Sequence, residues 1–374
     1  MKVIKMQVKR KNSIDFCLLF TMLILVVIGA VFVYSASSYS ASLQLKDSFY
    51  YLKKQIIGIV LGLISCVAFS FIDYKKLEKT KYVLAILSIV LLVLVFIPKI
   101  GTSKYGARRW INLGFFTVQP SEIAKFALII FAAGYMSKNA TKVRTFRGIL
   151  PVILLGIVFC GLIIMEPNMS ITMCMGLLLL FMLYIGGASF KHLLMLIIPL
   201  IVAVPLLIVV EPYRMKRLLA FLDPWAESSS TGYQLVQSLY ALGSGGLFGV
   251  GLFNSRQKYL FLPFAESDFI FSIIGEELGF LGCVLVLILF VILIYRIIKI
   301  ACNASTRFGS LLASGIASII GIQVLLNVAV VTGSIPPTGL PLPFMSAGST
   351  SLLVFMSAIG IVLNIDRQNR KEKI

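Results

Sequence analysis

The chain has 374 residues, of which 59% are hydrophobic and only 13% are charged. Because an average soluble domain has ~45–50% apolar and ~25% charged residues, this composition excludes a soluble globular enzyme, a disordered chain and a disulfide-stabilised secreted domain. It indicates a protein that crosses a membrane several times. The 34 basic residues against 15 acidic ones give a formal net charge of +19, and their distribution predicts the orientation of the chain.

A membrane-spanning helix needs ~20 largely apolar residues, because the hydrocarbon core of a bilayer is ~30 Å thick. The sequence therefore predicts an all-α polytopic integral membrane protein with about ten transmembrane helices, forming a single membrane domain over residues 16–365. The expected spans are residues 16–36, 55–72, 82–98, 121–137, 148–165, 168–186, 193–210, 269–295, 309–331 and 350–365.

The basic residues predict which side of the membrane each loop occupies. With residues 1–15 and 366–374 as cytoplasmic tails, 21 basic residues fall in inside segments and 12 in outside segments. Short cytoplasmic loops collect Lys and Arg, so both termini are expected in the cytoplasm. The outside excess of basic over acidic residues favours an anionic ligand there, such as a phosphate-bearing lipid. Attraction to anionic headgroups alone is the alternative.

The longest segment outside the predicted spans is the extracytoplasmic loop 211–268, between the seventh and eighth helices. Tyr233, Val236 and Tyr240 follow helical spacing, which predicts an amphipathic helix lying in the membrane interface. The glycines of this loop do not match the GxGxxG spacing and follow no strand, which excludes a dinucleotide site.

Charged residues inside predicted spans are costly and therefore suggest function. Glu122 and Lys125 are three residues apart on one helical face. Glu276 and Glu277 lie eight and nine residues into the eighth helix, so they are expected about 12–13 Å deep, near the midplane. The alternatives are a neutralising pair and protonated glutamates bonded to neighbouring helices.

An outer-face enzyme built from this sequence would need a carboxylate as its general base. The only histidine, His192, falls in a predicted cytoplasmic loop. Asp268 ends the long loop directly before a helix, where the helix dipole favours a carboxylate and partial burial raises its pKa. The alternative is an aspartate that only caps the helix.

The chain resembles the SEDS family of shape, elongation, division and sporulation proteins. Within this family it is more similar to the FtsW/SpoVE branch than to RodA. The matching motifs occur in order over nearly the whole chain. They are Gly106-Ala-Arg-Arg-Trp-Ile-Asn-Leu-Gly114, Gln119-Pro-Ser-Glu-Ile-Ala-Lys125, Phe221-Leu-Asp-Pro-Trp225, Gly232-Tyr-Gln234, Gly245-Gly-Leu-Phe-Gly-Val-Gly251, Asn254-Ser-Arg-Gln-Lys258, Asp268-Phe-Ile-Phe271, Gly275-Glu-Glu-Leu-Gly279 and Gly333-Ser-Ile-Pro-Pro-Thr-Gly339.

The resemblance implies a multi-pass enzyme of the bacterial cytoplasmic membrane that polymerises peptidoglycan glycan strands during division, shape maintenance or sporulation. Its substrate would be lipid II, an undecaprenyl-pyrophosphate-linked disaccharide pentapeptide. Its partners would be a class B penicillin-binding protein and the divisome or a related complex, with no role for nucleic acid. Asp268 would be the catalytic aspartate, and the functionally important residues beside the cavity would be Arg109, Trp110, Glu122 and Lys125.

Glycosyl transfer from a lipid pyrophosphate also needs positive charge at the leaving group. Arginine suits phosphate because its guanidinium can donate two parallel hydrogen bonds. A divalent cation, Mg or Mn, is plausible here, although the sequence contains no metal-ligand motif and no cofactor is certain. The candidate pyrophosphate partners are Arg108, Arg109, Lys125, Arg214, Arg217, Arg256 and Lys258.

The chain departs from the family pattern at Phe264, Asn168, Phe253 and Ala347. Since the family usually carries an acid at the position of Phe264, we expect Glu266 to compensate by tuning Asp268 or by helping to hold a cation. Two further hypotheses remain open at this stage. One is a lipid II flippase, and the other is a weakly catalytic scaffold for the penicillin-binding protein.

Overall fold

The computed structural model describes residues 14–104, 107–112, 114, 117–210, 212–226 and 232–372. Over these residues the chain forms twelve α-helices and one small antiparallel sheet. Seven of the described helices are long and apolar enough to cross a membrane. The prediction of a helical, polytopic membrane protein is therefore confirmed, and each of the ten predicted segments is helical over most of its length.

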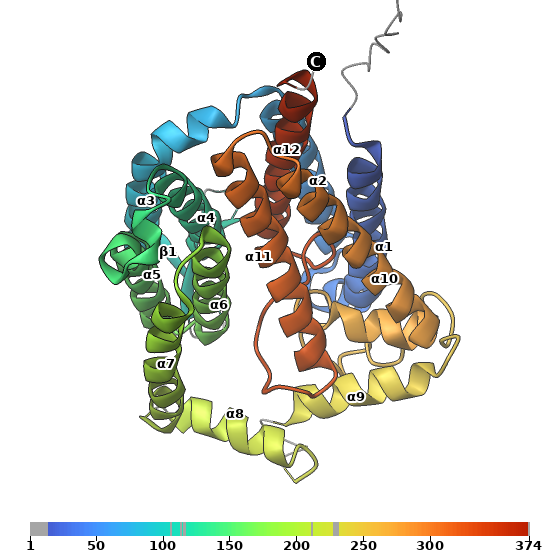
Figure 1. Cartoon of the computed structure of the whole chain (residues 1–374). Helices are drawn as coiled ribbons and strands as arrows, with labels where there is room; N and C mark the ends of the chain where they lie inside the picture. The colour runs from blue at the N-terminus through green and yellow to red at the C-terminus, as the bar shows by residue number, and fades with distance from the viewer. Residues whose placement is uncertain are drawn as a thin grey trace, which may run out of the picture.

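The helices form one bundle (Figure 1). α11 lies in its middle and contacts α4 and α6 on one side and α10 and α12 on the other. The helices are α1 (Phe16–Leu45), α2 (Tyr50–Phe71), α3 (Lys75–Leu94), α4 (Pro120–Lys138), α5 (Phe146–Met165), α6 (Met169–Gly186), α7 (Phe190–Val210), α8 (Pro212–Leu222), α9 (Tyr233–Gly245), α10 (Ile270–Cys302), α11 (Arg307–Val331) and α12 (Ser349–Glu372), with a 3-10 turn η1 (Lys142–Arg144).

Two helices of the long loop, α8 and α9, lie at the end of the bundle opposite the C-terminus (Figure 1). The amphipathic helix predicted in this loop is confirmed as α9, which buries Leu235 and Val236 and exposes Tyr240. The sequence analysis did not foresee α8. At the other end of the bundle, α12 continues to Glu372, so most of the predicted tail 366–374 is helical.

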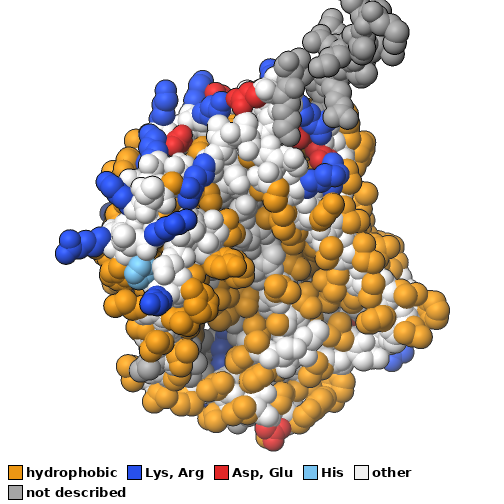
Figure 2. All heavy atoms as spheres, in the orientation of Figure 1, with side chains coloured by type: hydrophobic (Ala, Val, Ile, Leu, Met, Phe, Trp, Pro, Cys, Tyr) orange, Lys and Arg blue, Asp and Glu red, His pale blue; other side chains and the backbone are white. Residues whose placement is uncertain are grey.

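The surface is banded as expected for a membrane protein (Figure 2). Hydrophobic side chains cover most of the visible face, and Lys and Arg side chains concentrate at the end where the C-terminus lies. This concentration agrees with the cytoplasmic end expected from the basic residues.

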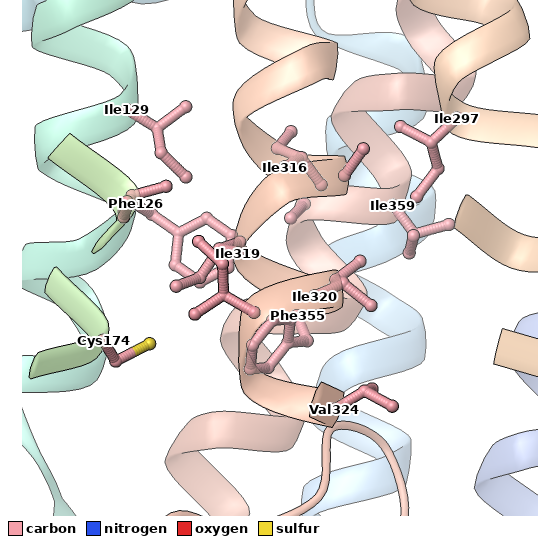
Figure 3. Packing of buried hydrophobic residues seen from close by; sticks show 14 of the residues in the cluster. Phe126, Ile129, Cys174, Ile297, Ile316, Ile319, Ile320, Val324, Phe355 and Ile359 are labelled. Carbon is pink, nitrogen blue, oxygen red and sulfur yellow. The ribbon is translucent and has the colours of Figure 1, made fainter. Parts of the chain in front are cut away.

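Buried hydrophobic side chains of α4, α11 and α12 pack against one another in the interior (Figure 3). Phe126 of α4 and Phe355 of α12 meet edge to face at 5.3 Å between ring centroids. Ile319 and Ile320 of α11 lie beside these rings. Because lipid is as apolar as these side chains, close van der Waals packing holds the helices together here.

A three-stranded antiparallel sheet, which the sequence analysis missed, lies between α3 and α4. Its strands are β1 (Gly101–Lys104), β2 (Ala107–Asn112) and β3 (Thr117–Val118), in the order β1–β2–β3. Successive residues of a strand point to opposite faces. Arg108 is accordingly exposed while Arg109 turns inward toward the bundle.

Helix α10 is broken at Gly279, which corrects the expected depth of the two glutamates. Gly279 has φ +68° and ψ −167°, a conformation that essentially only glycine adopts. Residues 280–302 alone are ~34 Å long at ~1.5 Å per residue, enough to cross the bilayer core. The two parts of α10 are therefore not one straight helix, and the depth of about 12–13 Å counted along a straight helix does not apply to Glu276 and Glu277.

Candidate functional site

Asp268 lies two residues before α10 begins at Ile270. The N-cap residue of α10 is Phe269, and no side chain caps the helix. The alternative interpretation of Asp268 as a helix cap is therefore not supported. Its side chain is half-buried, and its backbone carbonyl accepts a hydrogen bond of 2.8 Å from Asn327 Nδ2 of α11.

The connection between α11 and α12 packs directly against this aspartate. A Cβ atom on Gly339 would lie only 2.9 Å from Asp268 Oδ2, so the absence of a side chain there leaves room for the carboxylate. The Gly339 N–H donates to Ser170 Oγ at the start of α6, at 3.1 Å. The segments that enclose Asp268 thus come from three distant parts of the chain.

Charged neighbours and burial set the pKa of Asp268. Burial, and after it the nearby carboxylate of Glu266, raise this pKa, while Arg217 and Arg109 lower it, and the net result is a pKa of about 6. Burial also raises the pKa of Glu266. The structure therefore brings together four residues that the sequence analysis proposed, Arg109, Arg217, Glu266 and Asp268, and it gives Asp268 a pKa close to the working range of a general base.

Backbone carbonyls hold both arginines in place. Arg109 of β2 donates through Nε to the carbonyl of Glu166, at 3.2 Å, and through Nη2 to the carbonyl of Pro167. Arg217 of α8 donates through Nη1 to the carbonyl of Pro337, at 3.1 Å. Figure 2 shows a hollow in this part of the molecule, near α8, with Lys or Arg side-chain atoms visible inside it.

Glu166, between α5 and α6, is a residue to which the sequence analysis assigned no role. It is only 1% exposed, and among the described residues neither carboxylate oxygen has a hydrogen-bond partner. Burial raises its pKa to about 8, against the lowering effect of Arg109. The available signal in the sequence was an acid directly after an apolar helix, next to Pro167.

Glu122 and Lys125 form a fully buried pair inside the bundle. Lys125 Nζ lies 2.8 Å from Glu122 Oε1 and 2.8 Å from Gln323 Oε1 of α11. It also lies 5.5 Å from the centre of the Phe355 ring, a distance that allows a cation–π interaction. These contacts connect α4 to α11 and α12, and they include none with Asp268.

The structure places Lys258 in a buried polar cluster between α1 and α10. Lys258 Nζ lies 3.3 Å from Glu277 Oε1 and 3.3 Å from Ser35 Oγ. Glu276 accepts a 2.8 Å hydrogen bond from the Arg256 backbone N–H. The glutamates thus anchor the loop that leads to Asp268.

The remaining predicted cations are distributed over other surfaces. Arg256, together with Glu276 and part of α9, lines a cavity of ≈ 460 Å³. Arg108 is exposed on β2, beside the half-buried Trp110. Arg214 lies in α8, and its side chain is outside the described part of the structure.

Comparison with known proteins identifies relatives along the entire length of this chain. Residues 15–371 match the family described as "Cell cycle protein", which comprises FtsW, RodA and SpoVE. Stage V sporulation protein E of Bacillus subtilis is 41% identical over 364 residues, covering 96% of this chain and 99% of the relative. A probable peptidoglycan glycosyltransferase FtsW of Trichlorobacter lovleyi is 41% identical over 360 residues, covering 95% and 94%.

Solved structures agree with these sequence matches. A chain of a structure described as "Structural coordination of polymerization and crosslinking by a peptidoglycan synthase complex" superposes with a TM-score of 0.80, at 28% identity, covering 96% of this chain and 98% of that chain. The rod shape determining protein RodA of Thermus thermophilus gives a TM-score of 0.70 at 27% identity, with the same coverage. The chain therefore belongs to the FtsW/RodA/SpoVE family.

Proposed function

We propose that this protein is a peptidoglycan glycosyltransferase that polymerises lipid II at the outer face of the membrane, with Asp268 as its general base. The FtsW relatives carry the name probable peptidoglycan glycosyltransferase. The observation that supports the proposal most directly is the half-buried Asp268, with its pKa raised to about 6 between two arginines and a second carboxylate.

In this mechanism Asp268 accepts the proton of the acceptor sugar hydroxyl as that oxygen attacks the anomeric carbon of the lipid-linked donor. A carboxylate with a pKa of about 6 is ionised at neutral pH and is a stronger base than an ordinary aspartate. Its position before α10, at the outer end of the bundle, suits a substrate whose lipid chain stays in the bilayer.

Arg109 and Arg217 are the cations that we assign to the departing pyrophosphate. Both lower the pKa of Asp268, so their charges act at its position. Fixed positive charge in a partly buried site stabilises the negative charge that develops on a leaving group. Arg108 and Arg214 remain further candidates for contacts with the pyrophosphate.

Glu266 and Asp268 also fit a divalent cation, because Mg²⁺ is commonly held by one or two carboxylates together with substrate phosphates. Among the described residues, no group of three or more His, Cys, Asp or Glu side chains is arranged to hold a metal. When bound, such an ion would add positive charge at the pyrophosphate. The protein's own contribution would be the two carboxylates and their orientation.

The same proposal includes ten membrane crossings with both termini in the cytoplasm, and a class B penicillin-binding protein as partner. The crossings would be α1 to α7 and α10 to α12. The similarity to a chain in a peptidoglycan synthase complex supports the partner.

The test is polymerisation of labelled lipid II by the purified protein, with and without the partner transpeptidase. Asp268→Asn keeps the size of the side chain and removes its basicity, so the polymerisation rate should fall by at least ~10²-fold, while folding and lipid II binding persist. Asp47→Asn is the control, because Asp47 lies outside the matching motifs, in the turn between α1 and α2, and pairs at the surface with Lys53. It should polymerise at the wild-type rate.

Three outcomes would contradict the proposal. Polymer formation by Asp268→Asn at near the wild-type rate would place the base elsewhere. Movement of lipid II across vesicle membranes without any polymer from the wild type would instead indicate a flippase. A wild type that neither polymerises nor moves lipid II, yet stimulates its partner, would indicate a scaffold.

A further inference from the structure

Two amide side chains of α11 supply hydrogen bonds to an irregular, partly buried stretch of backbone. Residues 335–342, between α11 and α12, form no helix or strand, and Leu340 is completely buried. Buried carbonyl groups in such a segment have no partners within a helix or strand and need donors from elsewhere in the protein. Gln323 Nε2 donates to the carbonyl of Pro341 at 2.8 Å, and Asn327 Nδ2 donates to the carbonyl of Leu340 at 2.7 Å.

The same asparagine also holds the backbone of Asp268. Asn327 Nδ2 donates a second hydrogen bond, of 2.8 Å, to the Asp268 carbonyl. An amide nitrogen has two hydrogens, so both donors of Asn327 are used. One side chain, only 1% exposed, therefore joins Asp268 to the segment that carries Gly339, whose Cα lies against the Asp268 carboxylate.

Gln323 lies one turn before Asn327 on the same face of α11, and the buried ion pair fixes its orientation. Gln323 Oε1 accepts from Lys125 Nζ at 2.8 Å, which directs Nε2 toward Pro341. Lys125 in turn is held by Glu122 at 2.8 Å. A continuous chain of contacts thus leads from the charged pair in α4 to the backbone around Asp268.

We propose that Asn327 and Gln323 are positioning residues for Asp268, and that the Glu122–Lys125 pair acts on the reaction through Gln323. A displacement of a catalytic group by ~1 Å can cost ~10²-fold in rate, so loss of either amide should lower kcat. If the two amides served only to satisfy buried carbonyls, their loss would lower the stability of the protein and leave kcat unchanged. The kinetic part of this inference rests on the proposed glycosyltransferase function.

The test compares Asn327→Leu and Gln323→Leu with a matched control, Asn364→Leu. Asn364 of α12 is similarly buried, at 2% exposed, and also joins two backbone groups, the Ser70 carbonyl and the Tyr74 N–H. The measurements are hydrogen–deuterium exchange of peptides covering residues 264–270 and 336–342, the melting temperature, and kcat and KM for lipid II. If Asn327→Leu does not fold, Asn327→Asp keeps the shape and replaces the donor by an acceptor.

We expect both Asn327→Leu and Gln323→Leu to increase exchange in the 336–342 peptides. Asn327→Leu should also increase exchange in the 264–270 peptides. Both variants should lower kcat by ~10–10²-fold with little change in KM. Asn364→Leu should lower the melting temperature without either effect. Folded variants at Asn327 with unchanged exchange in both segments would overturn the proposal, whatever their activity. So would unchanged kcat in both Asn327→Leu and Gln323→Leu. If the wild type makes no polymer, the proposed function fails, and the exchange data still decide the positioning role.

Discussion

Two neighbouring acids, Glu266 and Asp268, share one site, and their mutual repulsion is part of what gives Asp268 its elevated pKa. Burial is the largest cause, and the Glu266 carboxylate is the next. This supports the expectation that Glu266 tunes Asp268. The effect has a direct consequence for the pH dependence of catalysis.

Replacement of Glu266 by glutamine should move the acidic limb of the pH–rate profile to lower pH. The raised pKa means that Asp268 loses its basic form as the pH falls through about 6. Without the repelling carboxylate that pKa falls, so the variant keeps its activity at a lower pH than the wild type. The measurement is kcat/KM for lipid II between pH 4.5 and 8. An unchanged profile, with an unchanged response to Mg²⁺, would show that Glu266 does not act on Asp268.

Replacement of Glu166 by glutamine should stabilise the protein, most strongly at high pH. Its pKa of about 8 lies above the ordinary value of 4.5, so the folded state binds more protons between these values, and stability falls as the pH rises through them. Each unit of such a shift corresponds to ~1.4 kcal/mol. Thermal unfolding at pH 6 and pH 9 measures the difference, with Asp223→Asn as control. An equal effect of Glu166→Gln at both pH values would contradict this assignment.

At the scale of helices, buried polar contacts decide which helix faces meet. The Lys125 ammonium binds both Glu122 and Gln323, which fixes α4 against α11 in a region otherwise filled by apolar side chains (Figure 3). A buried charge that loses its partner is strongly destabilising. The pair therefore has a structural role whatever its part in catalysis.

An exchange of the two residues, Glu122→Lys with Lys125→Glu, separates these roles. Glu122→Gln alone leaves an uncompensated lysine and should cost ~3–5 kcal/mol. The double variant restores charge balance and should fold, but a glutamate at 125 can no longer donate to Gln323 Oε1, so we expect polymerisation to stay low. Melting temperature and polymerisation rate are measured for these two variants and for the wild type. Wild-type activity in the exchanged protein would mean that the pair is purely structural.

At the scale of the whole molecule, the hydrophobic surface and the concentration of Lys and Arg at one end support the proposed orientation in the membrane (Figure 2). The loop with α8 and α9 lies at the opposite end (Figure 1). This arrangement puts Asp268 on the outer side in the proposed orientation.

Single cysteines test that orientation. In a background with the exposed native residues Cys17 and Cys302 replaced by serine, Trp225→Cys should react with an impermeant maleimide added outside intact cells. Lys371→Cys, at the end of α12, should react only after the membrane is permeabilised. Labelling of Lys371→Cys in intact cells would contradict both the ten crossings and the cytoplasmic C-terminus.

The sequence by itself determined the helical membrane architecture and the approximate position of ten helices, and it predicted Asp268 as the catalytic base. These features depend on local composition: apolar length sets a membrane helix, basic residues set orientation, and an outer face without histidine leaves a carboxylate as base. The family resemblance, carried by motifs over the whole chain, added the activity and the substrate.

Only the tertiary structure decided which charges meet. Lys258 was expected from the sequence to contact the pyrophosphate, yet it is buried with Glu277, which folding brings beside it. The pairing of Glu122 with Lys125 was open to prediction from their spacing, but the contact of Lys125 with Gln323 of α11 was not. The break at Gly279 separates Glu276 and Glu277 from the long part of α10, and periodicity alone cannot reveal a single left-handed residue. The roles of Glu166 and Asn327 depend on burial and on contacts between segments distant in sequence, which no local pattern encodes.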